Sequence, residues 1–76
     1  MDKFEKIIEK IEEDIRGIEF CIEANDLDIE DLAKSQSCMP AWAYKKERAE
    51  LLEIDRELRE DLRVAKEYLK DLEILD

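Results

Sequence analysis

Apolar residues in the first half of the chain recur at alternating steps of four and three positions. This spacing marks the seam of a heptad repeat, in which positions a and d of an α-helix face a partner helix. The a positions are Ile8, Ile15, Ile22 and Ile29, and the d positions include Phe4, Ile11, Ile18 and Leu32. The pattern therefore predicts a long amphipathic helix over residues 2–36.

The repeat crosses residues 25–28 without a change of phase, but two interpretations of this segment stay open. Asn25, Asp26 and Asp28 are all favourable N-cap residues, so the helix either continues or is kinked or broken there. If it continues, Asn25 takes a d position and nearly faces Asp55, an a position of the second half. Such a polar layer costs stability and fixes register or oligomeric state. If it breaks, Asn25 caps the helix and Asp55 faces water.

A lone proline separates the two halves of the pattern. Pro40 disfavours helical geometry at Met39 and suits the first turn of a new helix. Beyond Pro40 the sequence has no helix breaker, and a second seam places Leu62 and Leu69 at a and Leu51, Leu58, Ala65 and Leu72 at d. We therefore predict a turn at about 35–40 and a second helix at about 40–75.

Two helices of equal length on either side of one turn indicate an antiparallel helical hairpin. Each helix would be about 53 Å long at 1.5 Å per residue. The strand signals of β-branched alternation and Gly-containing hairpin turns are missing. The predicted fold class is all-α, with residues 1–76 forming a single helical domain.

Charges beside the seam provide a test of the antiparallel arrangement. The e positions of the first helix are all acidic: Glu5, Glu12, Glu19 and Asp26. The e positions Arg59 and Lys66 of the second helix are basic. We expect Glu19 to meet Arg59 across the seam, and Glu12 to meet Lys66. Exposed pairs of this kind contribute only a few tenths of a kcal/mol each, so they set register more than stability.

A second apolar stripe lies on the side of the first helix that faces away from the seam. Gly17, Phe20, Ala24 and Leu27 recur at steps of three, four and three, on c and f positions. Phe20 and Leu27 leave apolar surface in water if the hairpin is alone, and the two small residues let another helix approach closely. The alternative is that Phe20 and Leu27 belong to a segment that refolds locally after a helix break.

A two-helix hairpin has little core for its length. Each helix covers one stripe of the other, and a domain this small supplies only about 3–5 kcal/mol from one core. We therefore expect a second copy to cover the apolar stripe, which gives a homodimer arranged as a four-helix bundle.

The start of the second helix carries an aromatic and basic cluster. Its members are Trp42, Tyr44, Lys45, Lys46 and Arg48, a composition enriched at binding hot spots. Trp42 and Tyr44 are therefore candidates for a partner interface. We expect Trp42 to pack beneath the turn against Leu32 and Ile29, whereas for Tyr44 packing and partner binding both stay open.

Composition removes most catalytic and metal-binding chemistry. The chain has no His, two Cys and one Gly, so zinc sites, His-based acid–base catalysis and Gly-rich phosphate loops lack their residues. Asp26, Asp28 and Glu30 resemble the start of a calcium loop, but Asp31 stands where the loop needs Gly and Ser37 where it needs Glu. We expect no enzyme activity, no cofactor and no metal site.

The chain is strongly acidic, with 13 Lys and Arg against 23 Asp and Glu and a formal net charge of −10. This charge repels nucleic acids and anionic membranes, and it favours a partner protein with a basic surface. No apolar run approaches the roughly 20 residues that span a bilayer. Residues 1–4 lack a secretory pattern, so we expect a cytoplasmic protein with Cys21 and Cys38 reduced.

Two functions from different classes agree with these features. The favoured one is a non-enzymatic protein–protein interaction module, a small acidic homodimer that binds and modulates another protein. The alternative is an acidic inhibitor that mimics nucleic acid and blocks a basic groove through the acidic face Glu5, Glu12, Glu19 and Asp26. In size and charge the chain resembles small phage-encoded inhibitors of host defence nucleases. Affinity that falls steeply with salt would distinguish charge mimicry from an apolar interface.

Overall fold

The heptad seam of the first half forms one continuous helix in the computed structural model, which describes residues 3–75, with Leu75 by its backbone alone. This helix, α1, spans Lys3–Lys34 and has no break at residues 25–28. No glycine or proline occurs between positions 18 and 39 to interrupt its backbone hydrogen bonds. Of the two interpretations of residues 25–28, the continuous helix is confirmed.

A short connection follows α1, and hydrogen bonds between backbone groups hold its conformation. The Ser35 N–H donates to the carbonyls of Asp31 and Leu32, at 3.2 and 3.0 Å. A 3₁₀ turn, η1, follows at Gln36–Cys38, and Met39 is extended with φ −123° and ψ 149°. The extended backbone of Met39 is the conformation that a following proline imposes.

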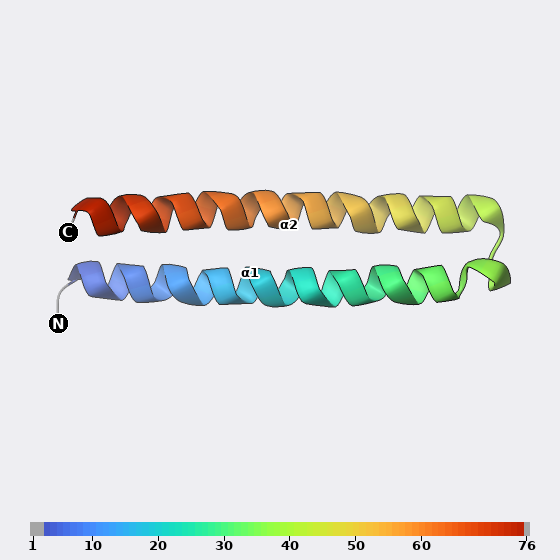
Figure 1. The fold of residues 1–76 in the computed structure, drawn as a ribbon, viewed down its shortest axis with the longest axis horizontal. Helices are drawn as coiled ribbons and strands as arrows, with labels where there is room; N and C mark the ends of the chain where they lie inside the picture. Colours follow the sequence, from blue (N-terminus) through green and yellow to red (C-terminus); the bar gives the residue numbers. More distant parts are fainter. Residues whose placement is uncertain (1–2, 76) are drawn as a thin grey trace.

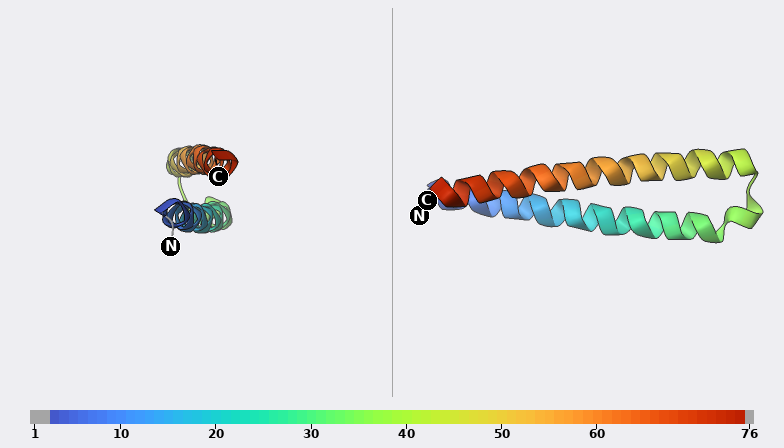
Figure 2. Two further views of the ribbon diagram at one scale, coloured as in Figure 1. Left: turned by 90° about the vertical axis from the view of Figure 1, so that its left-hand side faces the viewer. Right: turned by 45° about the horizontal axis from the view of Figure 1, so that its top comes forward.

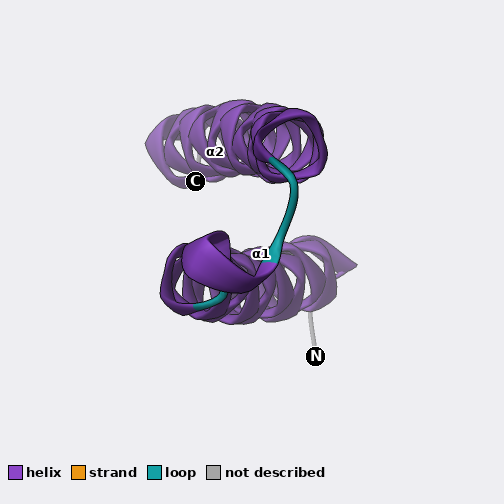
Figure 3. Cartoon of the chain, turned by 90° about the vertical axis from the view of Figure 1, so that its right-hand side faces the viewer, coloured by secondary structure: helices purple, strands orange, loops and turns teal. Residues whose placement is uncertain are grey.

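The second helix, α2, spans Ala41–Leu75 and begins directly after Pro40, whose carbonyl accepts a hydrogen bond from the Tyr44 N–H at 3.1 Å. It runs antiparallel to α1, so Lys3 and Leu75 lie at the same end of the molecule (Figure 1). The molecule measures 56 × 16 × 12 Å, and its helices cross slightly (Figure 2). The connection joins the helices at the opposite end (Figure 3). The all-α helical hairpin is therefore confirmed.

The core is a narrow line of side chains between the helices. Its buried apolar residues are Ile15, Ile22 and Leu32, each 8% exposed. The remaining seam residues are partly exposed: Phe4, Ile8, Ile11, Ile18, Ile29, Leu51, Leu58, Leu62, Ala65, Leu69 and Leu72. No side chain in the described part of the chain is fully enclosed, because each helix covers only one side of the other. The predicted seam is confirmed, and it forms a thin core.

A polar layer interrupts this seam at Asn25, which is 6% exposed. The Asn25 Nδ2 donates a hydrogen bond to the backbone carbonyl of Leu51 in α2, at 2.9 Å. Asp55 Oδ2 accepts from Arg59 Nε at 2.9 Å, while the buried Oδ1 accepts no hydrogen bond from a described residue. The predicted polar layer is therefore present, with Asn25 bonded to backbone, and it ties one level of α1 to one level of α2.

The hairpin exposes more surface than a compact chain of its mass. Its accessible surface is 6060 Å², whereas a folded monomer of 9.1 kDa is expected to expose about 4,900 Å². The rod shape explains this excess and leaves large apolar side chains in water. They are Ile7, Phe20, Leu27, Trp42, Leu52, Ile54, Val64, Tyr68 and Ile74. Even so, neither helix, over its described residues, has a stretch apolar enough to cross a membrane.

Candidate functional site

The apolar stripe of α1, formed by Gly17, Phe20, Ala24 and Leu27, lies in solvent on the side of α1 opposite α2. Phe20 is 71% exposed and Leu27 60%, and both small residues are also exposed. A Cβ built on Gly17 would have no neighbour within 4 Å. Because α1 is continuous, the alternative of a locally refolded segment is wrong. The α1 stripe is a single face about 15 Å long, given 1.5 Å per residue.

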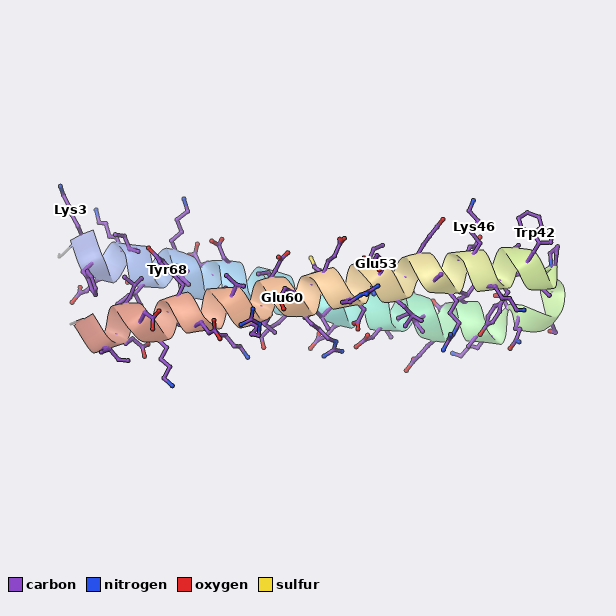
Figure 4. The ribbon with its side chains drawn as sticks, turned by 90° about the horizontal axis from the view of Figure 1, so that it is seen from above. Lys3, Trp42, Lys46, Glu53, Glu60 and Tyr68 are labelled. Carbon is purple, nitrogen blue, oxygen red and sulfur yellow. The ribbon has the colours of Figure 1, made fainter. Side chains whose placement is uncertain are left out.

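The aromatic residues at the turn end do not share one surface. Trp42 is 71% exposed and projects outward, as does Lys46 (Figure 4). The prediction that Trp42 packs against Leu32 and Ile29 is therefore wrong, because its b position in the repeat of α2 points away from the seam. Tyr44, at a d position, is half-buried. The turn end thus offers the Trp42 ring to solvent and keeps much of Tyr44 in the hairpin.

The predicted acidic face lies along one edge of the hairpin, where α2 partly neutralises it. Glu5, Glu12, Glu19 and Asp26 are all exposed. The Asp26 carboxylate lies 3.7 Å from the Arg59 guanidinium, so the expected pairing of Arg59 with Glu19 is wrong by one heptad. The expected pair of Glu12 and Lys66 is not among the ion pairs of the described residues, and Glu19 and Lys66 lie at exposed e positions of the same edge. We call Glu19, Asp26, Arg59 and Lys66 the paired edge.

The positive charge of this edge comes from α2. At its b and e positions between residues 45 and 70, α2 carries Lys45, Arg56, Arg59, Arg63, Lys66 and Lys70 and no acidic residue. The ion pairs among the described residues join Arg56 with Glu53, Arg59 with Asp26 and Asp55, and Arg63 with Glu60 and Glu67. Each of them therefore uses an arginine of α2.

Hydrogen bonds hold several of these groups in their charged forms. The bond from Arg59 to Asp55, together with the charge of that carboxylate, raises the pKa of the guanidinium. The bond from Arg63, followed by its charge, lowers the pKa of Glu60 below its ordinary value of 4.5. The Glu60 carboxylate is therefore ionised at neutral pH.

The opposite edge of the hairpin has no such balance of charge. Its c and g positions, over residues 14–31 of α1 and 47–71 of α2, carry eight acidic side chains and no basic one. The eight, all exposed, are Asp14, Asp28, Asp31, Glu47, Glu50, Glu57, Asp61 and Asp71. None of these carboxylates takes part in an ion pair with another described residue.

Two hollows lie along this edge, where the helices meet. One, of about 350 Å³, is lined by Ile11, Asp14, Asp61, Val64, Ala65 and Tyr68. The other, of about 380 Å³, is lined by Asp28, Asp31, Leu32, Ser35, Met39, Glu47 and Leu51. In both, carboxylates from the two helices flank apolar side chains. We call this region the acidic groove and define it by Asp14, Asp28, Glu47 and Asp61.

The acidic groove did not emerge from the sequence, because the charge test there used the e positions alone. The g positions of both helices did contain the information. They are acidic at each hollow: Asp14 and Asp61 at one, Asp28 and Glu47 at the other. In an antiparallel pair g positions face g positions, so they place like charges across the helices. Between the two hollows the g positions are Cys21 and Ile54, both exposed. Acidic pairs therefore flank an apolar level along the groove.

No family model, curated protein or solved structure matches the chain. The α1 stripe, the turn end and the acidic groove are therefore the features of the molecule that bear on its function.

Reactive groups are few and scattered in the described part of the chain. No three His, Cys, Asp or Glu residues there are placed to hold a metal ion. Cys21 and Cys38 are both free and exposed, and Cys38 Sγ lies 4.0 Å from Ser37 Oγ. What the arrangement offers is apolar area and charge, which are the two components of a protein-binding surface.

Proposed function

We propose that the protein is a non-enzymatic protein–protein interaction module that forms a homodimer through the α1 stripe and uses its other surfaces to bind a second protein. One observation carries this proposal: Phe20 and Leu27, 71% and 60% exposed, lie in phase with two small residues on a face that no other part of the hairpin covers. Exposed apolar residues arranged as a continuous stripe are typical of interfaces.

The order of residue sizes along the α1 stripe supports a twofold pairing. Small and large side chains alternate in the order Gly17, Phe20, Ala24, Leu27. If α1 of a second copy lies antiparallel and the axis passes near Ile22, Gly17 lies opposite Leu27 of that copy, and Ala24 opposite its Phe20. Large side chains then fit against small ones, as in knobs-into-holes packing. The same patch serves both copies, as a twofold interface requires.

This contact defines the shape of the proposed dimer. The α1 stripe lies opposite α2, so pairing through it places four helices in a row, α2–α1–α1–α2, a flatter arrangement than the four-helix bundle expected from the sequence. A square bundle would instead press the acidic grooves of the two copies together and add repulsion between their carboxylates. The row leaves each groove open.

Mimicry of nucleic acid has less support. A mimic needs an uninterrupted array of negative charges to compete with a phosphate backbone. The predicted face contains Asp26, which lies 3.7 Å from Arg59, and it shares its edge with the basic e residues Arg59 and Lys66 of α2. The interaction module is therefore the function that we propose.

Analytical ultracentrifugation tests the dimer. We expect the wild-type protein to sediment with twice the 9.1 kDa chain mass, and Phe20→Ser with Leu27→Ser to sediment as a monomer. The matched control is Ile74→Ser, which removes a side chain that is 72% exposed but lies outside the α1 stripe. The control should remain dimeric.

Gly17→Leu gives a sharper test, because it separates the hairpin from the dimer. The open space at Gly17 accepts the new side chain, and leucine favours the helix by up to about 1 kcal/mol over glycine. The same side chain occupies the place where a second copy would approach. We expect full helicity by circular dichroism with a weakened dimer. A monomeric wild-type protein, or a dimer unaffected by Gly17→Leu, would contradict the proposal.

A further inference from the structure

We propose that the acidic groove binds a basic amphipathic helix of a partner protein. This inference rests on the proposed interaction role and adds the surface that is used and the chemistry of the partner.

The negative charge of this groove does not stabilise the hairpin. Asp14 and Asp61 line one hollow from opposite helices, and Asp28 and Glu47 line the other. Like charges at neighbouring positions of a helix pair destabilise the pair. The chain has 13 basic residues, yet none lies at the c and g positions of this region. Positive charge supplied from outside would relieve the repulsion.

Apolar side chains in and beside the groove also lack cover. Val64 is 51% exposed, Tyr68 55% and Ile54 45%, and Tyr68 borders the hollow that contains Asp14 and Asp61. A ligand that carries charge alone would leave this apolar surface in water. The occupant therefore needs an apolar stripe with basic residues beside it, which is the pattern of a basic amphipathic helix.

The length of the groove suits a helix. Asp14 and Asp28 are two heptads apart, so the two acidic levels lie about 21 Å from each other at 1.5 Å per residue. A partner helix covers that distance in about 14 residues and can place lysine or arginine at both levels. A second copy of this chain fits poorly here, because it brings its own net charge of −10 against the same carboxylates.

A synthetic peptide provides the test. The probe is an 18-residue, fluorescein-labelled helix of leucine and lysine, with leucine on one face and lysine on both sides of it. We expect the wild-type protein to raise the fluorescence anisotropy of the probe, with an affinity that falls at least about fivefold between 50 and 300 mM NaCl. Absence of binding at 50 mM NaCl would overturn the proposal.

Two sets of neutralised carboxylates distinguish the groove from net charge. The groove set is Asp14→Asn, Asp28→Asn, Glu47→Gln and Asp61→Asn, and the control set is Glu9→Gln, Glu13→Gln, Glu23→Gln and Glu30→Gln. Both change the net charge by the same amount, but the control carboxylates lie at b and f positions of α1. We expect the groove set to weaken binding about tenfold and the control set less than about threefold. Equal weakening would overturn the proposal.

The outcomes separate this inference from the proposed dimer. If the groove set does not fold, the pair Asp14→Asn with Asp61→Asn makes the same comparison against Glu9→Gln with Glu13→Gln. Sedimentation of the same samples reports the dimer independently of the peptide. A monomeric wild-type protein whose peptide affinity depends on the groove set would leave the groove in place and remove the dimer. Loss of the peptide in Phe20→Ser with Leu27→Ser would assign the probe to the α1 stripe and overturn the groove.

Discussion

Along one edge of the hairpin the carboxylate of Asp26 in α1 lies 3.7 Å from the guanidinium of Arg59 in α2. Along the other edge Asp14 and Asp61, also from opposite helices, line the same hollow, and no basic residue lines it with them. Both edges are made by the same two helices and the same turn. The difference between the paired edge and the acidic groove therefore lies in their side chains alone.

The two edges have opposite effects on the stability of the free hairpin. The paired edge places opposite charges across the helices, so it supports the antiparallel arrangement without any other molecule. The acidic groove opposes that arrangement by a small amount, because exposed charges interact weakly in water. A feature that slightly destabilises the free hairpin and remains open to solvent is better suited to contact with a partner than to folding.

The largest expected effect comes from turning the paired edge into a second acidic edge. Arg59→Glu with Lys66→Glu removes the partners of Asp26 and Asp55 and places like charges across both edges. We expect the melting temperature, followed by circular dichroism at low salt, to fall by about 10 °C. The control Lys6→Glu with Lys46→Glu changes the net charge equally at f positions, which are directed away from the other helix. An equal loss in the control would show that net charge alone decides stability.

The reverse change in the acidic groove should stabilise the free hairpin by a smaller amount. Glu47→Lys with Asp61→Lys places opposite charges across both hollows, and we expect the melting temperature to rise by about 5 °C at low salt. Added salt screens the wild-type repulsion, so the gain should shrink at about 0.5 M NaCl. Glu50→Lys with Asp71→Lys is the control at c positions, farther from α1. A groove variant less stable than the wild type would contradict the assigned repulsion.

The smallest expected effect concerns an ion pair within α2 that does not cross to α1. Arg63 lowers the pKa of Glu60 below 4.5 in the folded state. A carboxylate of this kind stabilises the fold above its unfolded pKa and loses that contribution as the pH falls through its folded pKa. Glu60→Gln should therefore lower the melting temperature slightly at pH 7, and the difference from the wild type should shrink as the pH falls below 4.5. A difference that persists in acid would contradict this account.

The fold could be predicted from the sequence because two signals agree. The apolar residues keep a strict heptad phase through Asn25, and Pro40 is a strong local stop between two uninterrupted helical patterns. Whether residues 25–28 stay helical could not be decided from local preferences, since Asn25 and its acidic neighbours also favour caps. The tertiary hydrogen bond from Asn25 to Leu51, at 2.9 Å, accompanies the continuous helix.

The prediction assigned the wrong partner to Arg59 because it ignored the tilt of side chains on a helix. The prediction paired residues at one level of the hairpin, which joined Glu19 with Arg59. Side chains of an α-helix tilt toward its N-terminus, and in an antiparallel pair the two tilts are opposed. Asp26 therefore reaches toward the open end and Arg59 toward the turn, and they meet from different levels at 3.7 Å.

Part of the candidate site could also be predicted from the sequence. The α1 stripe was visible because Phe20 and Leu27 keep a helical phase with small residues between them. The acidic groove depends on which side chains α1 and α2 bring together, so it required the g positions of both helices to be compared. Trp42 was misplaced because the prediction followed its nearness to the turn, whereas its heptad position directs it into solvent.

The exposed ring of Trp42 gives the molecule a built-in optical reporter. It is the one tryptophan of the chain, it is 71% exposed, and it stands at the turn end (Figure 4). Indole emission shifts to shorter wavelength when water around the ring is replaced by apolar atoms. A ligand seated over the turn should therefore change the emission spectrum, while one held beside Asp14 and Asp61, near the far end, should leave it unchanged.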